Sequence, residues 1–97
     1  MEFKQLEMFV AVAEERSTLR AAARVFRTQP AVSMALSKLE EEIGSCLFHR
    51  SPQQRFHLTT AGEVLCEYAK RMLALRDEAA EVVAKGTMEC SQVRRVN

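Results

Sequence analysis

Between Arg16 and Leu39 the sequence contains basic and small polar residues but no Asp or Glu. A second stretch without acids runs from Ile43 to Gly62, and acids gather outside both stretches, as in the run from Glu40 to Glu42. A surface that excludes carboxylates suits a polyanion, because phosphate contacts supply most of the non-specific affinity for nucleic acid. An ordinary solvated basic face would give the same charge pattern, so both readings stay open on charge alone.

Within the first stretch lie side chains that can read base edges. Gln bonds adenine with two hydrogen bonds, Ser donates or accepts, and Met or Pro contacts a thymine methyl. The candidate readers are Thr28, Gln29, Pro30, Ser33, Met34 and Ser37. Lys and Arg side chains more naturally contact phosphates, and such contacts position the protein on DNA without reading its sequence. The candidates for backbone contact here are Arg20, Arg24, Arg27 and Lys38.

To reach base edges, these side chains must be presented by a suitable fold. Two short helices joined by a tight turn have the geometry that places the second helix in the major groove. Ser17 or Thr18 can cap the first of the two helices. Its expected buried residues are Leu19, Ala21, Ala22 and Val25. Thr28 is the expected cap of the second, with Pro30 in its first turn and Gly44 as a left-handed end. Its expected inward residues are Val32, Leu36, Leu39 and Ile43.

An amphipathic helix precedes this pair and ends near Glu15. Its apolar stripe consists of Phe3, Leu6, Phe9, Val10 and Ala13. After Gly44, residues 48–58 read as a small β-hairpin, because the segment from Arg55 to Leu58 alternates like a short strand. Arg50 and Arg55 are candidate cationic contacts there, and Arg55 suits a narrow minor groove. Arg50 could instead bind local carbonyls and hold the hairpin in place.

Helical signals return after residue 58, with Thr59 as a possible cap and Thr60 to Glu63 matching a capping box. Apolar residues then recur in steps of four and three, the heptad pattern of a helix that pairs with another helix. The predicted dimerisation residues are Ala61, Leu65, Tyr68, Met72, Leu75, Ala79 and Val82. We expect pairing between two chains, although the helix could fold back on its own core. Residues 87–97 form a polar tail.

Composition narrows the class of protein. A chain of 97 residues holds one compact domain, and it has neither an apolar run of bilayer length nor a signal peptide at its start. We therefore expect a cytoplasmic protein without a membrane partner.

Cys46, Cys66 and Cys90 are too far apart for a zinc site, so reduced thiols are expected, with a redox-sensing thiol as the alternative. No constellation of catalytic residues is present, which predicts a protein that is not an enzyme.

Five motifs in order carry a resemblance to a known family. They are Ala21-Ala22, the run from Thr28 to Ser33, Leu39-Glu40, Leu47-Phe48-x-Arg50 and Leu58-Thr59-x-Ala61-Gly62. Together they resemble the LysR-type transcriptional regulators. The resemblance implies a mostly α fold: a winged helix-turn-helix of three helices and a short β-hairpin wing, followed by a long dimerisation linker helix. The corresponding division is residues 1–58, 59–86 and the tail.

The resemblance also implies a function: sequence-specific binding of double-stranded promoter DNA in bacteria. Helix 29–43 would lie in the major groove and wing 48–58 on the adjacent minor groove or backbone. It implies a homodimer on a partly palindromic site, a tetramer in the full-length protein, and RNA polymerase as a further partner. No cofactor is expected in this chain, since the small-molecule co-inducer of such regulators binds a C-terminal domain that this sequence lacks.

Several positions depart from the family pattern. Arg16 stands where Gly is common, and Thr18-Leu19 inverts the usual order of an aromatic and then a hydroxyl residue, which leaves the cap of the second helix open. Met34 stands where Arg is common, and Arg27 stands where an aliphatic residue is usual, so we expect its side chain to leave the core for solvent or the DNA backbone. Two alternatives remain. One is a helix-turn-helix-like protein-interaction module without DNA binding; the other is the similar head of molybdate-responsive regulators, which the paired linker helix fits less well.

Overall fold

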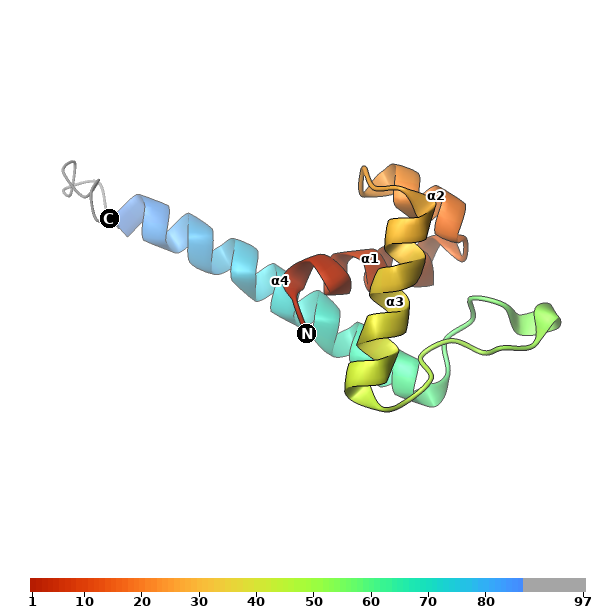
Figure 1. The fold of residues 1–97 in the computed structure, drawn as a ribbon. Helices are drawn as coiled ribbons and strands as arrows, with labels where there is room; N and C mark the ends of the chain where they lie inside the picture. The colour runs from red at the N-terminus through yellow and green to blue at the C-terminus, as the bar shows by residue number, and fades with distance from the viewer. Residues whose placement is uncertain (87–97) are drawn as a thin grey trace.

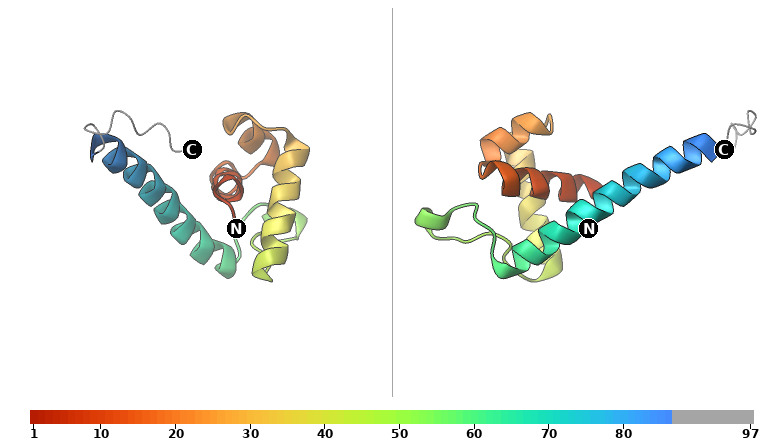
Figure 2. Two further views of the ribbon diagram at one scale, coloured as in Figure 1. Left: turned by 60° about the vertical axis from the view of Figure 1, so that its left-hand side comes forward. Right: turned by 180° about the vertical axis from the view of Figure 1, so that it is seen from behind.

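The computed structural model describes residues 1–86, which fold into four α-helices and one 3-10 turn. In chain order these are α1 (Phe3–Glu15), α2 (Thr18–Arg24), α3 (Gln29–Ile43), η1 (Pro52–Gln54) and α4 (Thr60–Gly86). Helix α1 lies at the centre and contacts each of the other three α-helices, and α4 extends well past the rest of the molecule (Figures 1 and 2). The predicted tail, residues 87–97, lies outside the described residues. Among the described residues, no helix combines the length and the apolar character that a membrane span requires.

The central position of α1 explains why it is buried on more than one face. Leu6, Phe9 and Val10 are buried as the apolar stripe predicts, and one view along α1 shows it between α3 and α4 (Figure 2). Phe3 departs from the prediction, because its side chain is half exposed. Its ring lies 5.3 Å from the guanidinium carbon of Arg76 on α4, so it covers the junction of the two helices rather than the core.

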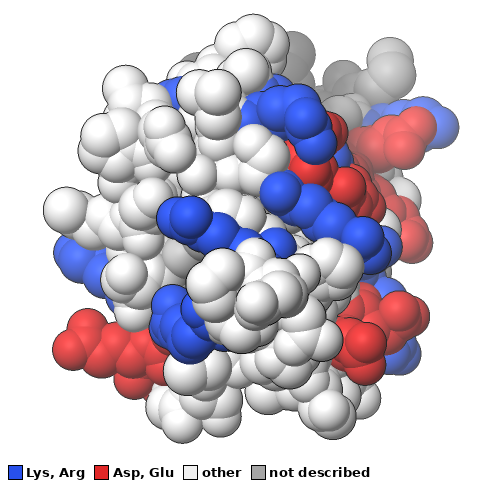
Figure 3. All heavy atoms as spheres, turned by 90° about the vertical axis from the view of Figure 1, so that its right-hand side faces the viewer, with Lys and Arg blue, Asp and Glu red and all other residues white. Residues whose placement is uncertain are grey.

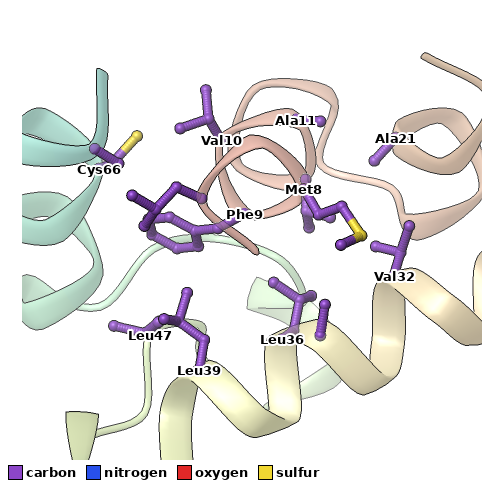
Figure 4. Packing of buried hydrophobic residues seen from close by; sticks show 14 of the residues in the cluster. Met8, Phe9, Val10, Ala11, Ala21, Val32, Leu36, Leu39, Leu47 and Cys66 are labelled. Atoms are coloured by element: carbon purple, nitrogen blue, oxygen red, sulfur yellow. The ribbon is translucent and has the colours of Figure 1, made fainter. Parts of the chain in front are cut away.

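The core forms where α1, α3 and the segment after α3 meet. Phe9, Leu39 and Leu47 are completely buried there and lie close together (Figure 4). Gly44 has a φ of 81° and ends α3 in the left-handed conformation, as predicted. The predicted burial of Ile43 is wrong, since this side chain is 37% exposed; the chain turns back at Gly44, and Leu47 fills the core instead.

The first residue of α2 is Thr18, so a different set of its residues is buried from the one that the sequence predicted. Ser17 is the cap, because its hydroxyl accepts a hydrogen bond of 3.1 Å from the amide of Arg20. Thr18 is therefore the first helical residue and is buried, whereas Leu19 is 66% exposed. The prediction that Leu19 faces the core is wrong. Ala21 is buried as expected.

The segment between α3 and α4 contains a single antiparallel bridge, between Phe48 and Leu58, instead of the predicted hairpin of two short strands. The amide of His49 donates to the carbonyl of His57 at 2.9 Å, and the amide of Thr59 donates to the carbonyl of Leu47 at 3.0 Å; a longer ladder does not form among the described residues. Pro52 has no amide hydrogen for a ladder and begins the 3-10 turn η1. Phe56 then adopts a φ of 64°, which is incompatible with a regular strand. We call residues 48–58 the wing.

Helix α4 starts at a double hydrogen bond made by one hydroxyl. The Thr59 Oγ1 accepts from the amide of Gly62 at 3.0 Å and donates to the carbonyl of Cys46 at 2.6 Å. Thr59 is thus the cap, and the predicted capping box from Thr60 to Glu63 does not form, since Thr60 is already helical. The same hydroxyl ties the first turn of α4 to the segment before the wing.

Two cysteines fall within the described residues and differ in environment. Cys66, on α4, is buried, and this burial raises the pKa of its thiol, which disfavours the reactive thiolate form. Cys46 is exposed. The prediction for Cys90 concerns a residue outside the described part of the chain.

Candidate nucleic-acid interface

The outward face of α3 presents the predicted base readers together. The Thr28 Oγ1 caps the helix by accepting from the amide of Ala31 at 3.2 Å, and Pro30 occupies the first turn, where a missing amide hydrogen costs nothing. The exposed residues of this face are Gln29, Pro30, Ser33, Met34, Ser37 and Lys38. They alternate with the buried Val32, Leu36 and Leu39, so one face packs and the other is free.

The Gln29 side chain at the start of α3 is held by a residue that sequence reasoning did not assign to the site. Its amide nitrogen donates to the Thr18 hydroxyl at 2.8 Å, in a partly buried contact. Thr18 was a candidate cap, whereas the structure makes it a positioning residue. A glutamine amide has two N–H donors and one carbonyl, so one N–H and the carbonyl remain for a base edge. The Thr18 contact fixes the direction in which they point.

A groove separates this face of α3 from the wing. Gln29, Ser33 and Ser37 line its α3 side, and Arg50 and Arg55 line its wing side. Between them lie the rings of Phe48 and Phe56, whose centroids are 6.1 Å apart in an edge-on arrangement. Phe48 and Phe56 thus give the groove an apolar part between polar and cationic residues, and Glu40 also lines it.

Glu40 attaches the wing to α3. One carboxylate oxygen accepts from the amide of Leu47 at 2.7 Å, and the other pairs with the Arg50 guanidinium. A contact with the sulfur of Cys46, together with the Glu40 carboxylate, raises the pKa of Arg50. Of the two roles left open for Arg50, the structure contains a local one, although its partner is a carboxylate rather than carbonyls. The sequence placed Glu40 in an acidic run and in the Leu39-Glu40 motif, and neither pattern predicts this role.

The two arginines of α2 that were predicted to contact phosphates are paired with α1. Arg24 approaches Glu14 at 2.7 Å and Glu15 at 3.4 Å. Arg20 donates to the Glu15 carbonyl at 2.9 Å and lies 3.6 Å from its carboxylate. The hydrogen bond from Arg24 lowers the pKa of Glu14. Both guanidinium groups are thus partly neutralised before any ligand arrives.

Three other predicted cations have no carboxylate within ion-pair distance among residues 1–86: Arg27, Lys38 and Arg55. All three are exposed. Arg55 lies over the neighbouring Phe56 ring, 5.2 Å from its centroid. Seen from the end where α2 and the wing lie, Lys and Arg cross the middle of the surface and acids lie toward its edges (Figure 3). The charges on this face suit a polyanion.

The predicted dimerisation residues divide between two faces of α4. Ala61, Leu65 and Met72 pack partly against the core of their own chain, beside the buried Cys66 and Ala69. The remaining residues of the predicted seam point to solvent: Tyr68, Leu75, Ala79 and Val82. The first half of α4 therefore does fold against its own domain, while a second apolar stripe stays free.

Three helices around α1, a tight turn between α2 and α3, and a wing beside α3 define a helix-turn-helix protein. The profile of the family described as "Bacterial regulatory helix-turn-helix protein, lysR family" matches residues 3–63, which is more than half of the chain. The chain belongs to this LysR family.

Known proteins similar to the chain agree with this assignment. The HTH-type transcriptional regulator BudR of Klebsiella aerogenes is 46% identical over 81 residues, covering 84% of this chain and 56% of BudR. The HTH-type transcriptional regulator CysL of Bacillus subtilis (strain 168) is 38% identical over 85 residues, covering 87% of this chain and 28% of CysL. The chain thus spans about half of one relative and about a quarter of the other.

Two solved structures match nearly the whole described chain. The crystal structure of the BenM_DBD/benA site 1 DNA complex superposes with a TM-score of 0.84 at 32% identity, covering 91% of this chain and 98% of that one. The crystal structure of the CbnR_DBD-DNA complex superposes with a TM-score of 0.82 at 34% identity, covering 90% and 99%. Both are complexes with DNA.

Proposed function

We propose that this chain is the DNA-binding part of a bacterial LysR-type transcription regulator, with α3 as the recognition helix. The exposed polar face of α3, with Gln29 held by Thr18 at its start, carries the proposal. A helix that presents polar side chains from its N-terminal half fits the major groove. The two DNA complexes that share this fold support it.

The roles of individual residues follow from their surroundings. Gln29 and Ser33 lie on the exposed face of α3 and are proposed to contact base edges, while Met34, 62% exposed, offers an apolar contact for a thymine methyl. Arg55 and Lys38 lack a carboxylate partner within residues 1–86 and are proposed to hold phosphates. Because Arg50 is paired with Glu40, its main role is to position the wing.

The chain is further proposed to act as a homodimer through α4. Tyr68, Leu75 and Val82 are all more than half exposed, and they lie on one side of the helix at steps of seven residues. Burial of such a stripe against its copy would remove apolar surface from water. A twofold dimer would then place two α3 helices on two half-sites.

Titration of the chain with DNA tests the proposal. Binding to DNA from its own upstream intergenic region is measured by fluorescence anisotropy at several salt concentrations. We expect affinity to fall steeply as salt rises, because cations on the protein displace condensed counterions, and one site to be preferred over the rest. A folded, dimeric chain that fails to bind at low salt would contradict the proposal and favour the interaction-module alternative.

Two variants separate base reading from phosphate contact. Gln29→Ala should relax preference at one base position, whereas Arg55→Ala should weaken binding to all sequences about equally and lower the salt slope by roughly one. If Gln29→Ala instead weakened every sequence uniformly, Gln29 would not be a base reader. A tetramer, a co-inducer bound by another domain, contact with RNA polymerase and a cytoplasmic location remain proposals from the family resemblance.

A further inference from the structure

The turn between α2 and α3 holds an aromatic side chain that neither burial nor backbone conformation favours. Phe26 is 93% exposed and has a φ of 58°. Its amide and that of Arg27 donate to the carbonyls of Ala23 and Ala22, at 3.3 and 2.9 Å. This hydrogen-bond pattern ends many helices, and its left-handed residue is usually Gly or Asn. A side chain with a Cβ costs about 1–2 kcal/mol there, and the Phe26 ring gains no compensating contact with the core.

Phe26 continues an exposed apolar stripe along α2. Leu19 is 66% exposed, and it shares one side of α2 with the exposed Ala23 four residues later. Phe26 follows two residues after the last helical residue, Arg24. Thr18, Ala21 and Ala22, which face the core, lie on another side. Within the part of the chain that the structure describes, nothing covers the stripe.

An arginine directly follows each residue of the stripe in the sequence. Arg20 and Arg24 share their charges with carboxylates of α1, whereas Arg27 has no carboxylate within ion-pair distance among residues 1–86. The surface therefore offers an apolar contact and at least one unneutralised guanidinium beside it.

An apolar surface beside an unneutralised guanidinium suits some ligands better than others, and DNA, a second copy of this chain and a partner protein can be compared. DNA phosphates gain nothing from Leu19 and Phe26, because apolar side chains offer them no hydrogen bond. A second copy of the same patch would bring its arginines together across a twofold axis, and like charges there oppose association. A protein segment with apolar anchors and flanking carboxylates matches both parts of the surface.

We propose that Leu19, Ala23 and Phe26 form a docking surface for an acidic amphipathic segment of a partner protein, with Arg27 pairing with its carboxylates. We call these residues the α2 surface. It lies on α2 and the turn rather than on the outward face of α3, so a partner can dock while α3 faces its own ligand. The strained position of Phe26 is the cost of presenting the ring.

The test uses a synthetic helical peptide with Leu and Trp on one face and Glu along its flank. A matched peptide carries Lys in place of every Glu. In NMR titrations of the 15N-labelled chain, the acidic peptide should shift resonances of residues 19–27, and the basic peptide should not. Phe26→Asn should weaken acidic-peptide binding at least about tenfold, as loss of a central aromatic anchor does, and Arg27→Ala should weaken it several-fold.

The Phe26→Asn variant also separates docking from folding. Asn tolerates the left-handed conformation, so the variant should melt at the same or a higher temperature than the parent chain. Failure of the acidic peptide to bind, equal binding by Phe26→Asn, or shifts centred on α3 and the wing would each overturn the proposal.

Two further measurements test whether DNA or a second copy of the chain binds the α2 surface instead. DNA affinity and self-association of Phe26→Asn, followed by anisotropy and sedimentation, should both stay within about twofold of the parent chain, far below the loss expected for a central contact residue. Loss of DNA affinity would assign the α2 surface to DNA, and altered self-association would assign it to a second copy. Either result would overturn docking of a partner protein.

Discussion

The helix-turn-helix, residues 17–43, and the wing region, residues 44–59, are held in place in different ways. In the first, Val32 and Leu39 are completely buried against α1, and side-chain hydroxyls cap both helices. In the second, only Leu47 and Phe48 are buried, and a few polar contacts hold the rest. Apolar packing therefore fixes the candidate base-reading face, whereas the candidate backbone contacts depend on a small number of hydrogen bonds.

This difference predicts where single substitutions act. A change at the junction of the two regions should affect the whole domain, and a change at a polar contact should affect only the wing or one reading side chain. Four substitutions test that distinction, in order of decreasing expected effect.

The largest effect is expected for Gly62→Ala at the start of α4. An added Cβ would lie 2.1 Å from the carbonyl oxygen of Leu47, and that oxygen also accepts from the amide of Thr59 at 3.0 Å. Because backbone must move to relieve the clash, the free energy of unfolding should fall by about 3 kcal/mol. Gly86→Ala is the control, since nothing lies within 4 Å of its added Cβ. Thermal unfolding compares the two, and equal melting temperatures would contradict the close contact.

A smaller effect, confined to the wing, is expected for Glu40→Ala. The change leaves the Leu47 amide without its acceptor and Arg50 without its carboxylate. Loss of a hydrogen bond to a charged group should cost about 1–3 kcal/mol, and amide exchange in the wing should rise more than in α1. Glu41→Ala, at an exposed neighbouring position, serves as the control. If wing exchange were unchanged, Glu40 would not be what holds the wing.

Thr18→Val should change base preference with little change in stability. Valine keeps the buried volume but cannot accept the hydrogen bond from Gln29. The preference at the base that Gln29 reads should fall several-fold, while unfolding changes by about 1 kcal/mol or less. A double-mutant cycle with Gln29→Ala gives the control. A further loss of preference when Thr18→Val is added to Gln29→Ala would show that Thr18 acts by another route.

The smallest effect concerns pH and the contact between α1 and α2. The pKa of Glu14 is lowered in the folded chain, first by its hydrogen bond with Arg24. A carboxylate with a lowered pKa stabilises the fold above its ordinary value near 4.5, and this contribution disappears as the pH falls through the folded-state pKa. Because both side chains are partly exposed, the effect should stay below about 1 kcal/mol.

Unfolding of Glu14→Gln and the parent chain, measured between pH 7 and pH 3, checks this expectation. The parent should be the more stable at neutral pH, and the difference should shrink as the pH falls below that ordinary value. A difference that stays constant across the range would mean that the ion pair with Arg24 does not contribute.

The sequence predicted the apolar helices well because their signal is periodic and local. Thr28, Pro30 and Gly44 mark the ends of α3, and each has the predicted role. The errors occur where a shift of the helix start by one residue changes which side chains face the core. Ser17 rather than Thr18 caps α2, and this single step turns Leu19 outward and Thr18 inward.

Which cations are already paired could not be predicted, because pairing depends on contacts across the fold. Arg24 and Glu14 are ten positions apart on different helices, and Arg50 reaches back to Glu40 from the wing. Charge patterning marked all the arginines of the acid-free stretches alike. The fold divides them into those held by carboxylates, such as Arg20, and those such as Arg55 with no such partner in residues 1–86.

Because α4 is a single long helix, the number of residues along it fixes the direction in which its exposed second half points relative to its packed first half. At 3.6 residues per turn, one residue inserted after Asp77 would leave the packed first half unchanged and rotate Val82 by about 100° relative to Leu75. Seven inserted residues, close to two full turns, would return Val82 to within about 20° of its original side. The exposed half of α4 thus sets an angle as well as a distance for whatever binds along it.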